Sequence, residues 1–141
     1  MAMETEGRHL DADIIGAGVT AVLQDASNGR YWLAETEGAV VGQLMVTYEW
    51  SDWRNGRFWW IQSVYVRDDF RRKGIFSALH RHVEALALAS EEVCGLRLYV
   101  ERQNLRAQRT YEAMGMTSPG YEVMEVDFRN NPQRQPRHDD D

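Results

Sequence analysis

Three consecutive basic residues, Arg71, Arg72 and Lys73, stand directly before Gly74 in the chain. They follow an apolar run and precede a segment with helical periodicity, so they occupy a loop at the start of a helix. The first N–H groups of a helix lack intrahelical acceptors and carry partial positive charge, so this loop suits phosphate or pyrophosphate. Gly74 lets a ligand approach the backbone closely. The loop matches neither a Walker loop nor GxGxxG. A solvated basic turn with a packing glycine is the alternative interpretation.

A second segment, 104–116, carries polar groups at helical spacing. Asn104, Ala107, Tyr111 and Met114 recur at intervals of three or four residues, which places them on one face of a helix. Asn104 alone could simply cap that helix, and Tyr111 could be a packing tyrosine with a satisfied hydroxyl.

No metal site is expected from the histidines. His80 and His82 lie two residues apart on a predicted helix, so their side chains diverge instead of converging on an ion. The single cysteine, Cys94, is expected to pack, and it excludes an intramolecular disulfide.

The elements that must position these residues alternate between strand and helix. Strands are expected where apolar and polar residues alternate or where apolar runs are short, and helices where apolar residues recur every three or four positions. Turns are expected at Glu37-Gly38 and Asn55-Gly56. The predicted order is helix 10–25, strands 31–37, 39–50 and 57–66, helix 75–90, strand 96–100, helix 104–114 and strand 121–128. This order predicts a mixed α/β (α+β) sheet.

Composition and charge narrow the class of protein. The chain has 141 residues and a formal net charge of -6, so sequence-independent nucleic-acid binding is not expected to be its main role. We expect one domain over 1–129 and a disordered polar tail over 130–141. No apolar run approaches the ~20 residues of a membrane span, and no signal peptide is evident. With one cysteine, the expected location is the cytoplasm.

Taken together, the two segments resemble the GNAT superfamily of N-acetyltransferases, over roughly residues 30–128. Residues 71–76 occupy the family's [RQ]-x-x-G-x-[GA] loop, with Phe76 where the family prefers Gly or Ala. Asn104, Ala107, Tyr111 and Gly115 match every position of the family's N-x-x-A-x-x-x-Y-x-x-x-G pattern.

The resemblance implies a fold and a cofactor site. The fold would be a mostly antiparallel mixed sheet flanked by helices, with fourth and fifth strands that splay apart to admit the thioester of acetyl-CoA. The family's first strand is absent from the expected order. The arm of acetyl-CoA would bond the fourth strand near Val64, Tyr65 and Val66, with an oxyanion-stabilising amide near Val64. Its pyrophosphate would lie on the amides of 71–77, namely Arg71, Arg72, Lys73, Gly74, Ile75, Phe76 and Ser77.

The resemblance also implies catalytic roles. Tyr111 matches the tyrosine that gives a proton to the departing thiolate, and a phenol with a pKa of about 10 is protonated at neutral pH. Asn104 would hold the cofactor arm or a water molecule. Glu49 and Glu101, at strand ends, could receive the amine proton, although surface carboxylates are common at such positions.

The implied activity is direct transfer of acetyl from acetyl-CoA to a primary amine, on a small molecule or a peptide. The alternative is a non-catalytic acyl-CoA-binding or interaction module on the same fold. The aromatic residues of the 48–60 hairpin are expected to divide between the core and an acceptor pocket or dimer contact. Because strand 31–37 would be a sheet edge, we also expect a possible homodimer.

Overall fold

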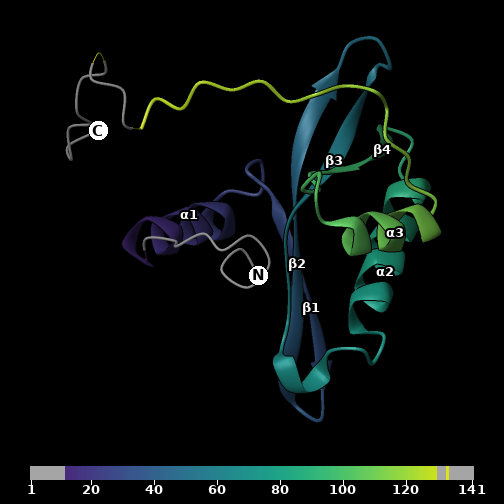
Figure 1. The fold of residues 1–141 in the computed structure, drawn as a ribbon. Helices are drawn as coiled ribbons and strands as arrows, with labels where there is room; N and C mark the ends of the chain where they lie inside the picture. The colour runs from purple at the N-terminus through teal and green to yellow at the C-terminus, as the bar shows by residue number, and fades with distance from the viewer. Residues whose placement is uncertain (1–11, 130–132, 134–141) are drawn as a thin grey trace. The chain divides into compact units, whose positions relative to one another are not determined.

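The computed structural model describes residues 12–129 and 133 (Figure 1). The chain divides into two compact units, Met1–Gln103 and Asn104–Asp141, and each is described by itself. The first contains helix α1 (Ala12–Gln24), strands β1 (Arg30–Thr36), β2 (Ala39–Ser51) and β3 (Gly56–Val66), the short 3-10 helix η2 (Asp68–Phe70), helix α2 (Ile75–Ala89) and strand β4 (Val93–Leu98). The second contains helix α3 (Leu105–Ala113).

One mixed sheet organises the first unit. Its strand order is β1-β2-β3-β4. The first two pairs are antiparallel and are joined by tight turns, whereas β4 runs parallel to β3. A parallel neighbour requires a crossover connection, and α2 supplies it. The predicted fold class is confirmed.

The sequence located the first hairpin turn, whereas the second is a longer loop over 52–55, closed by the pair Ser51–Gly56. Glu37 and Gly38 have φ values of 51° and 78°, the left-handed pair that a two-residue hairpin needs. At the second turn only Asn55 has a positive φ. Gly56 is needed for space instead, because a Cβ there would lie 2.9 Å from the carbonyl oxygen of Glu92.

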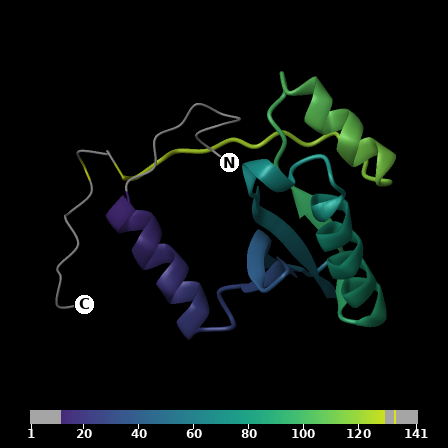
Figure 2. The ribbon, with the colours of Figure 1, turned by 90° about the horizontal axis from the view of Figure 1, so that it is seen from below.

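The core lies between α2 and one face of the sheet (Figure 2). Leu79 and Val83 of α2 pack against Leu44, Val46 and Ile61 of β2 and β3, and all five are buried. The helical spacing of Leu79 and Val83 and the strand alternation at Leu44 and Val46 bring these side chains together. Each such burial contributes roughly 1.5–3 kcal/mol. This packing sets α2, and therefore the loop before it, at a defined place beside β3.

Two predicted elements differ in the structure. Residues 121–128 form no strand, and the apolar side chains of Tyr121, Val123, Met124 and Phe128 are exposed. Alternation creates a face that a strand can bury, but a strand exists only where its backbone finds a partner. The strand predicted at 96–100 spans Val93–Leu98 instead. α1 begins at Ala12, the first described residue, so the expected absence of the family's first strand lies outside the described residues, as does the predicted tail apart from residue 133.

Candidate functional site

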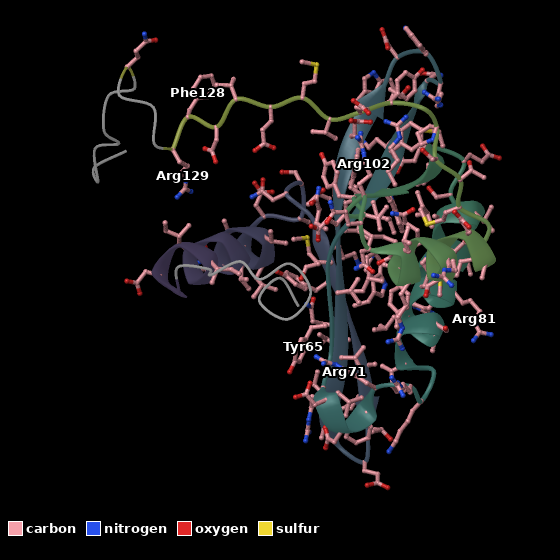
Figure 3. The ribbon with its side chains drawn as sticks, in the orientation of Figure 1. Tyr65, Arg71, Arg81, Arg102, Phe128 and Arg129 are labelled. Atoms are coloured by element: carbon pink, nitrogen blue, oxygen red, sulfur yellow. The ribbon has the colours of Figure 1, made fainter. Side chains whose placement is uncertain are left out.

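The basic loop connects β3 to α2 through η2, and Arg71 stabilises it from within. The Arg71 guanidinium donates from Nε to the carbonyl oxygen of Val66 at 3.0 Å and pairs with the Asp68 carboxylate at 2.7 Å. It also lies 5.8 Å from the centre of the Tyr65 ring, and Figure 3 shows Arg71 and Tyr65 near each other at the end of the sheet. Arg71 therefore ties the loop to the end of β3.

Arg72 and Lys73 are the exposed cations of the loop. Arg72 has a φ of 64° and Gly74 a φ of 81°, both in the left-handed region. A non-glycine residue seldom adopts this region, so the loop holds Arg72 in an uncommon conformation. The Lys73 ammonium lies 5.2 Å from the centre of the Phe70 ring. The two positive charges thus face solvent beside the start of α2.

The start of α2 has the geometry of an anion site. Gly74 is its N-cap residue, and the first N–H of the helix to bond within it is that of Ala78, which donates to the Gly74 oxygen at 3.0 Å. The amides of Ile75, Phe76 and Ser77 precede this bond and lie outside the helix ladder. The Phe76 ring lies 6.0 Å from the His80 ring, so the bulky side chain lies along its own helix.

β3 continues beyond its pairing with β4. The parallel ladder ends at Ile61 and Leu98, while β3 runs on to Val66. On that side, residues 62–66 of β3 pair with no other strand among the residues that the structure describes. The register with β2 shifts between Met45 and Val46, so Gln62 is the extra residue of a β-bulge.

Within this stretch of β3, the predicted cofactor-binding residues alternate between the two faces. Val64 packs against the core, Val66 is buried and Tyr65 is exposed. All three residues lie in the part of β3 that extends beyond the end of β4. The structure therefore brings Val64, Tyr65, Val66 and the 71–77 loop into one continuous path.

The face of the sheet opposite α2 carries a cluster that joins three strands. Glu49 of β2 accepts a hydrogen bond from Nη1 of Arg97 of β4 at 2.5 Å. The Arg97 guanidinium lies over the Phe58 ring at 3.6 Å. Trp60, opposite Arg97 in the register, stacks against Tyr99 with ring centres 4.5 Å apart. Glu49, predicted as a proton acceptor, thus has an ion-pair partner in the structure.

The other aromatic residues of the hairpin divide between the core and the surface. Tyr48 and Trp59 pack against the core, whereas Trp50 and Trp53 are 59% and 86% exposed. Glu101 is exposed on the turn that follows β4.

In the second unit, Asn104 caps α3. Its Oδ1 accepts a hydrogen bond from the Ala107 amide at 3.1 Å. The capping role, one of the two interpretations of Asn104, is therefore present, and the side-chain amide group is left for another contact. The helix ends before Gly115, whose φ of 91° suits a left-handed stop. Burial raises the pKa of Tyr111 above its usual value, so its phenol is protonated at neutral pH.

The sequence analysis did not predict the burial of His80 or the place of Arg97 in the cluster on the sheet. His80 is 1% exposed, and its Nε2 has no hydrogen-bond partner among the described residues. Burial lowers its pKa, an effect that the nearby Glu84 only partly opposes. Arg97 was missed although a signal existed: it alternates with Leu96 and Leu98, which places a charge on the second face of β4.

Neither a metal site nor a membrane span is found in the part of the chain that the structure describes. No three potential ligands gather there, and no helix is both long and apolar enough to cross a bilayer.

Solved structures share this fold. A possible acetyltransferase from Clostridium difficile 630 is 47% identical, with a TM-score of 0.85 over 89% of this chain and 83% of that one. The aminoglycoside N-acetyltransferase AAC(6')-Iy, solved with a bisubstrate analogue of CoA, is 14% identical, with a TM-score of 0.68 over 83% of this chain and 80% of that one. A ribosomal-protein-alanine N-acetyltransferase from Brucella melitensis is 21% identical, with a TM-score of 0.67 over 79% of each chain. The last two similarities concern the fold.

No curated protein sequence matches the chain. The family model for the acetyltransferase (GNAT) family, however, matches residues 5–116, which is most of its length. This match covers the hairpin strands, the basic loop and the Asn104 to Gly115 segment on which the resemblance rests. The chain belongs to the acetyltransferase (GNAT) family and is an acyltransferase.

Proposed function

We propose that this protein transfers acetyl from acetyl-CoA to a primary amine by direct attack of the amine on the thioester. The observation that carries the proposal is the continuous path from the unpaired edge of β3, residues 62–66, to the amides that open α2. A backbone edge with unpaired N–H and C=O groups suits an amide-containing arm, and the helix start suits the phosphates of the same molecule.

The cofactor contacts follow from this path. The arm of acetyl-CoA lies along Val64, Tyr65 and Val66 and exchanges hydrogen bonds with those backbone groups of this stretch that point away from β2. The pyrophosphate rests on the amides of 71–77, with Arg72 and Lys73 adding full charges. The Arg71 side chain stabilises the loop, because its guanidinium bonds the Val66 carbonyl oxygen and the Asp68 carboxylate. A neighbour of the same fold, AAC(6')-Iy, has been solved with CoA, which agrees with this assignment.

The chain's own groups then serve the chemistry. The Val64 amide donates to the carbonyl oxygen as negative charge develops on it. Tyr111 gives its proton to the sulfur as the carbon–sulfur bond breaks, and Asn104 holds the cofactor arm through its side-chain amide. The proton of the attacking amine passes to a carboxylate, Glu49 or Glu101, directly or through water.

Calorimetric titration with acetyl-CoA, followed by thiol-release assays over a panel of amines, tests the proposal. We expect binding with a 1:1 stoichiometry and turnover with at least one class of amine. Binding without turnover on any amine would identify a non-catalytic acyl-CoA-binding module instead. A lack of acetyl-CoA binding would refute both. The single cysteine agrees with a reducing location, and we place the protein in the cytoplasm.

A further inference from the structure

The cluster of Glu49, Phe58, Trp60, Arg97 and Tyr99 lies on the face of the sheet that α2 leaves open. Phe58 and Trp60 alternate with Trp59 and Ile61, which belong to the core beneath α2. If the proposed function holds, the acceptor reaches the thioester from this open face, because α2 packs on the other face. The cluster is then a surface along which the acceptor lies.

Arg97 is held in place and yet retains unused donors. Its guanidinium carries five N–H bonds in a rigid fork. Nη1 bonds Glu49, and the Phe58 ring supports one face of the guanidinium at 3.6 Å. Among the described residues, Nε and Nη2 of Arg97 have no acceptor, and the side chain is 26% exposed. Fixed, partly desolvated guanidinium donors of this kind bind a carboxylate.

The charges around Phe58 favour an anion at the same place. A second guanidinium, that of Arg54, lies 4.9 Å from the centre of the Phe58 ring. Two guanidinium groups and the single carboxylate of Glu49 leave one positive charge locally, in a chain whose formal net charge is -6. The cluster thus carries a local positive charge although the net charge of the chain is negative.

The geometry of β3 gives the distance from the Arg97 cluster, at Phe58, to Val64, where the proposed function places the reacting carbonyl group. Phe58 and Val64 are six residues apart on β3, and one of those residues, Gln62, is the extra residue of the bulge. Five rises of ~3.3 Å give about 16 Å. An acceptor that reaches both points must therefore carry its carboxylate about 16 Å from its amine. Trp60 and Tyr99 lie between the two points, and Tyr99 is 58% exposed.

We infer that the acceptor is a peptide with a free N-terminal amine and an acidic side chain near its fifth residue, bound by Arg97. An extended peptide advances about 3.3 Å per residue, so about 16 Å corresponds to roughly five residues. The intervening residues cross the rings of Trp60 and Tyr99, whose centres lie 4.5 Å apart with their planes inclined by 33°. A small amino acid is too short to span the two points.

Three matched hexapeptides, alanine except at one position, test this inference with the wild-type enzyme. The acidic peptide has glutamate as its fifth residue, the amide peptide has glutamine there, and the shifted peptide has its glutamate as the second residue. We expect kcat/KM for the acidic peptide to exceed that for the other two by about tenfold or more, mainly through KM. Raising the ionic strength should reduce this ratio. Equal kcat/KM values for the acidic and amide peptides would overturn the inference and leave acetyl transfer standing.

The variants Arg97→Gln and Arg97→Lys test whether the Arg97 guanidinium binds the glutamate carboxylate of the peptide. The ratio of kcat/KM for the acidic peptide to that for the amide peptide should fall to about one in Arg97→Gln. It should recover only partly in Arg97→Lys, which keeps the charge but not the fork. Acetyl-CoA affinity, measured by calorimetry, should stay as in the wild type and so report an intact fold. Arg57→Gln is the matched control, because Arg57 is an exposed arginine on β3 outside the cluster. An unchanged ratio in Arg97→Gln would overturn the assignment.

Product binding separates this inference from the proposed function. The N-acetylated form of the acidic peptide should bind wild-type protein at least about tenfold more tightly than it binds Arg97→Gln, with CoA present and no turnover required. If no amine is acetylated while this preference persists, the acceptor site stands and the proposed catalysis fails. If acetylation of amines occurs without this preference, the proposed function stands and the peptide assignment fails.

Discussion

At the scale of single residues, Tyr111 is the side chain on which the proposed chemistry depends most. Its pKa is raised by burial, so it holds its proton at neutral pH and can give it to a leaving thiolate. A half-buried phenol also contributes to packing, and the two roles predict different consequences of removing one oxygen atom.

Tyr111→Phe should lower kcat by roughly 100-fold or more while leaving acetyl-CoA affinity unchanged. The ring remains, so its packing is preserved while the proton donor is lost. Steady-state thiol release gives kcat, and calorimetry gives the affinity. Normal turnover in the phenylalanine variant would show that Tyr111 is a packing residue.

The second prediction concerns the pH dependence of stability at His80, which is buried without a partner for Nε2 among the described residues. Its pKa is lower in the folded chain than the usual value near 6.5. Below about pH 6.5 the unfolded chain therefore binds more protons than the folded chain. The stability that His80 contributes is complete above that pH and declines as the pH falls.

Urea unfolding between pH 7 and 5 should show this decline, with a slope of at most about 1.4 kcal/mol per pH unit from one group. His80→Leu should remove that slope, whereas the exposed neighbour variant His82→Gln should keep it. An identical pH dependence in His80→Leu and the wild type would assign the decline to other groups.

At the scale of elements, the loop before α2 combines two kinds of positive charge. The helix start supplies partial charge on its amides, and Arg72 and Lys73 supply full charge at the same end. Because Arg71 fixes the loop to β3, these charges are positioned before any ligand arrives.

The double variant Arg72→Glu/Lys73→Glu should weaken acetyl-CoA binding at least about 100-fold, since it removes two attractions and adds two repulsions. Arg30→Glu/Arg57→Glu changes the net charge equally on exposed strand positions and is the control. Calorimetry at one ionic strength compares the two. Equal affinities in both variants would remove the loop from the cofactor site.

The pairing of β3 with β4 depends on a glycine. A Cβ on Gly95 would lie 2.8 Å from Cε1 of Phe58, the ring that supports Arg97. Gly95→Ala must therefore displace a buried ring, and it should destabilise the fold by about 1–3 kcal/mol. Gly18→Ala in α1 meets nothing within 4 Å and should be stabilising by roughly 0.5–1 kcal/mol. Denaturant midpoints measure both, and a neutral Gly95→Ala would show that the ring moves freely.

At the scale of the whole molecule, β1 is an edge of the described sheet. Its outer side carries Leu33, which is 60% exposed, and a hollow of about 270 Å³ lined in part by Trp32, Leu33 and Ile75. Exposed edges with apolar neighbours invite pairing with another chain.

We expect a homodimer at micromolar concentration, with twice the 16.3 kDa mass of one chain. Leu33→Lys should shift it toward the monomer, because edge lysines oppose strand pairing. Sedimentation velocity measures the mass, with Leu88→Lys on the exposed side of α2 as the control. A monomer in the wild type would contradict the expectation.

Much of the architecture could be read from local chemistry in the sequence. The turn at Glu37-Gly38, the end of α3 before Gly115 and the start of α2 at Gly74 each follow from what a few neighbouring residues require of the backbone. The buried residues of α2 follow from helical spacing, and the family pattern at Asn104 to Gly115 follows from the order of types. These features depend on contacts within a few residues along the chain.

Tertiary structure decided whatever depends on partners far apart in sequence. The alternation at 121–128 predicts a strand, yet strand pairing requires a second backbone, and the structure gives this segment none. Burial of His80 and the pairing of Glu49 with Arg97, 48 positions away, arise because three strands and a helix meet. Sequence supplied the residue types, and folding placed Glu49, Phe58 and Arg97 in contact, because only the sheet register can bring residues so distant in sequence side by side.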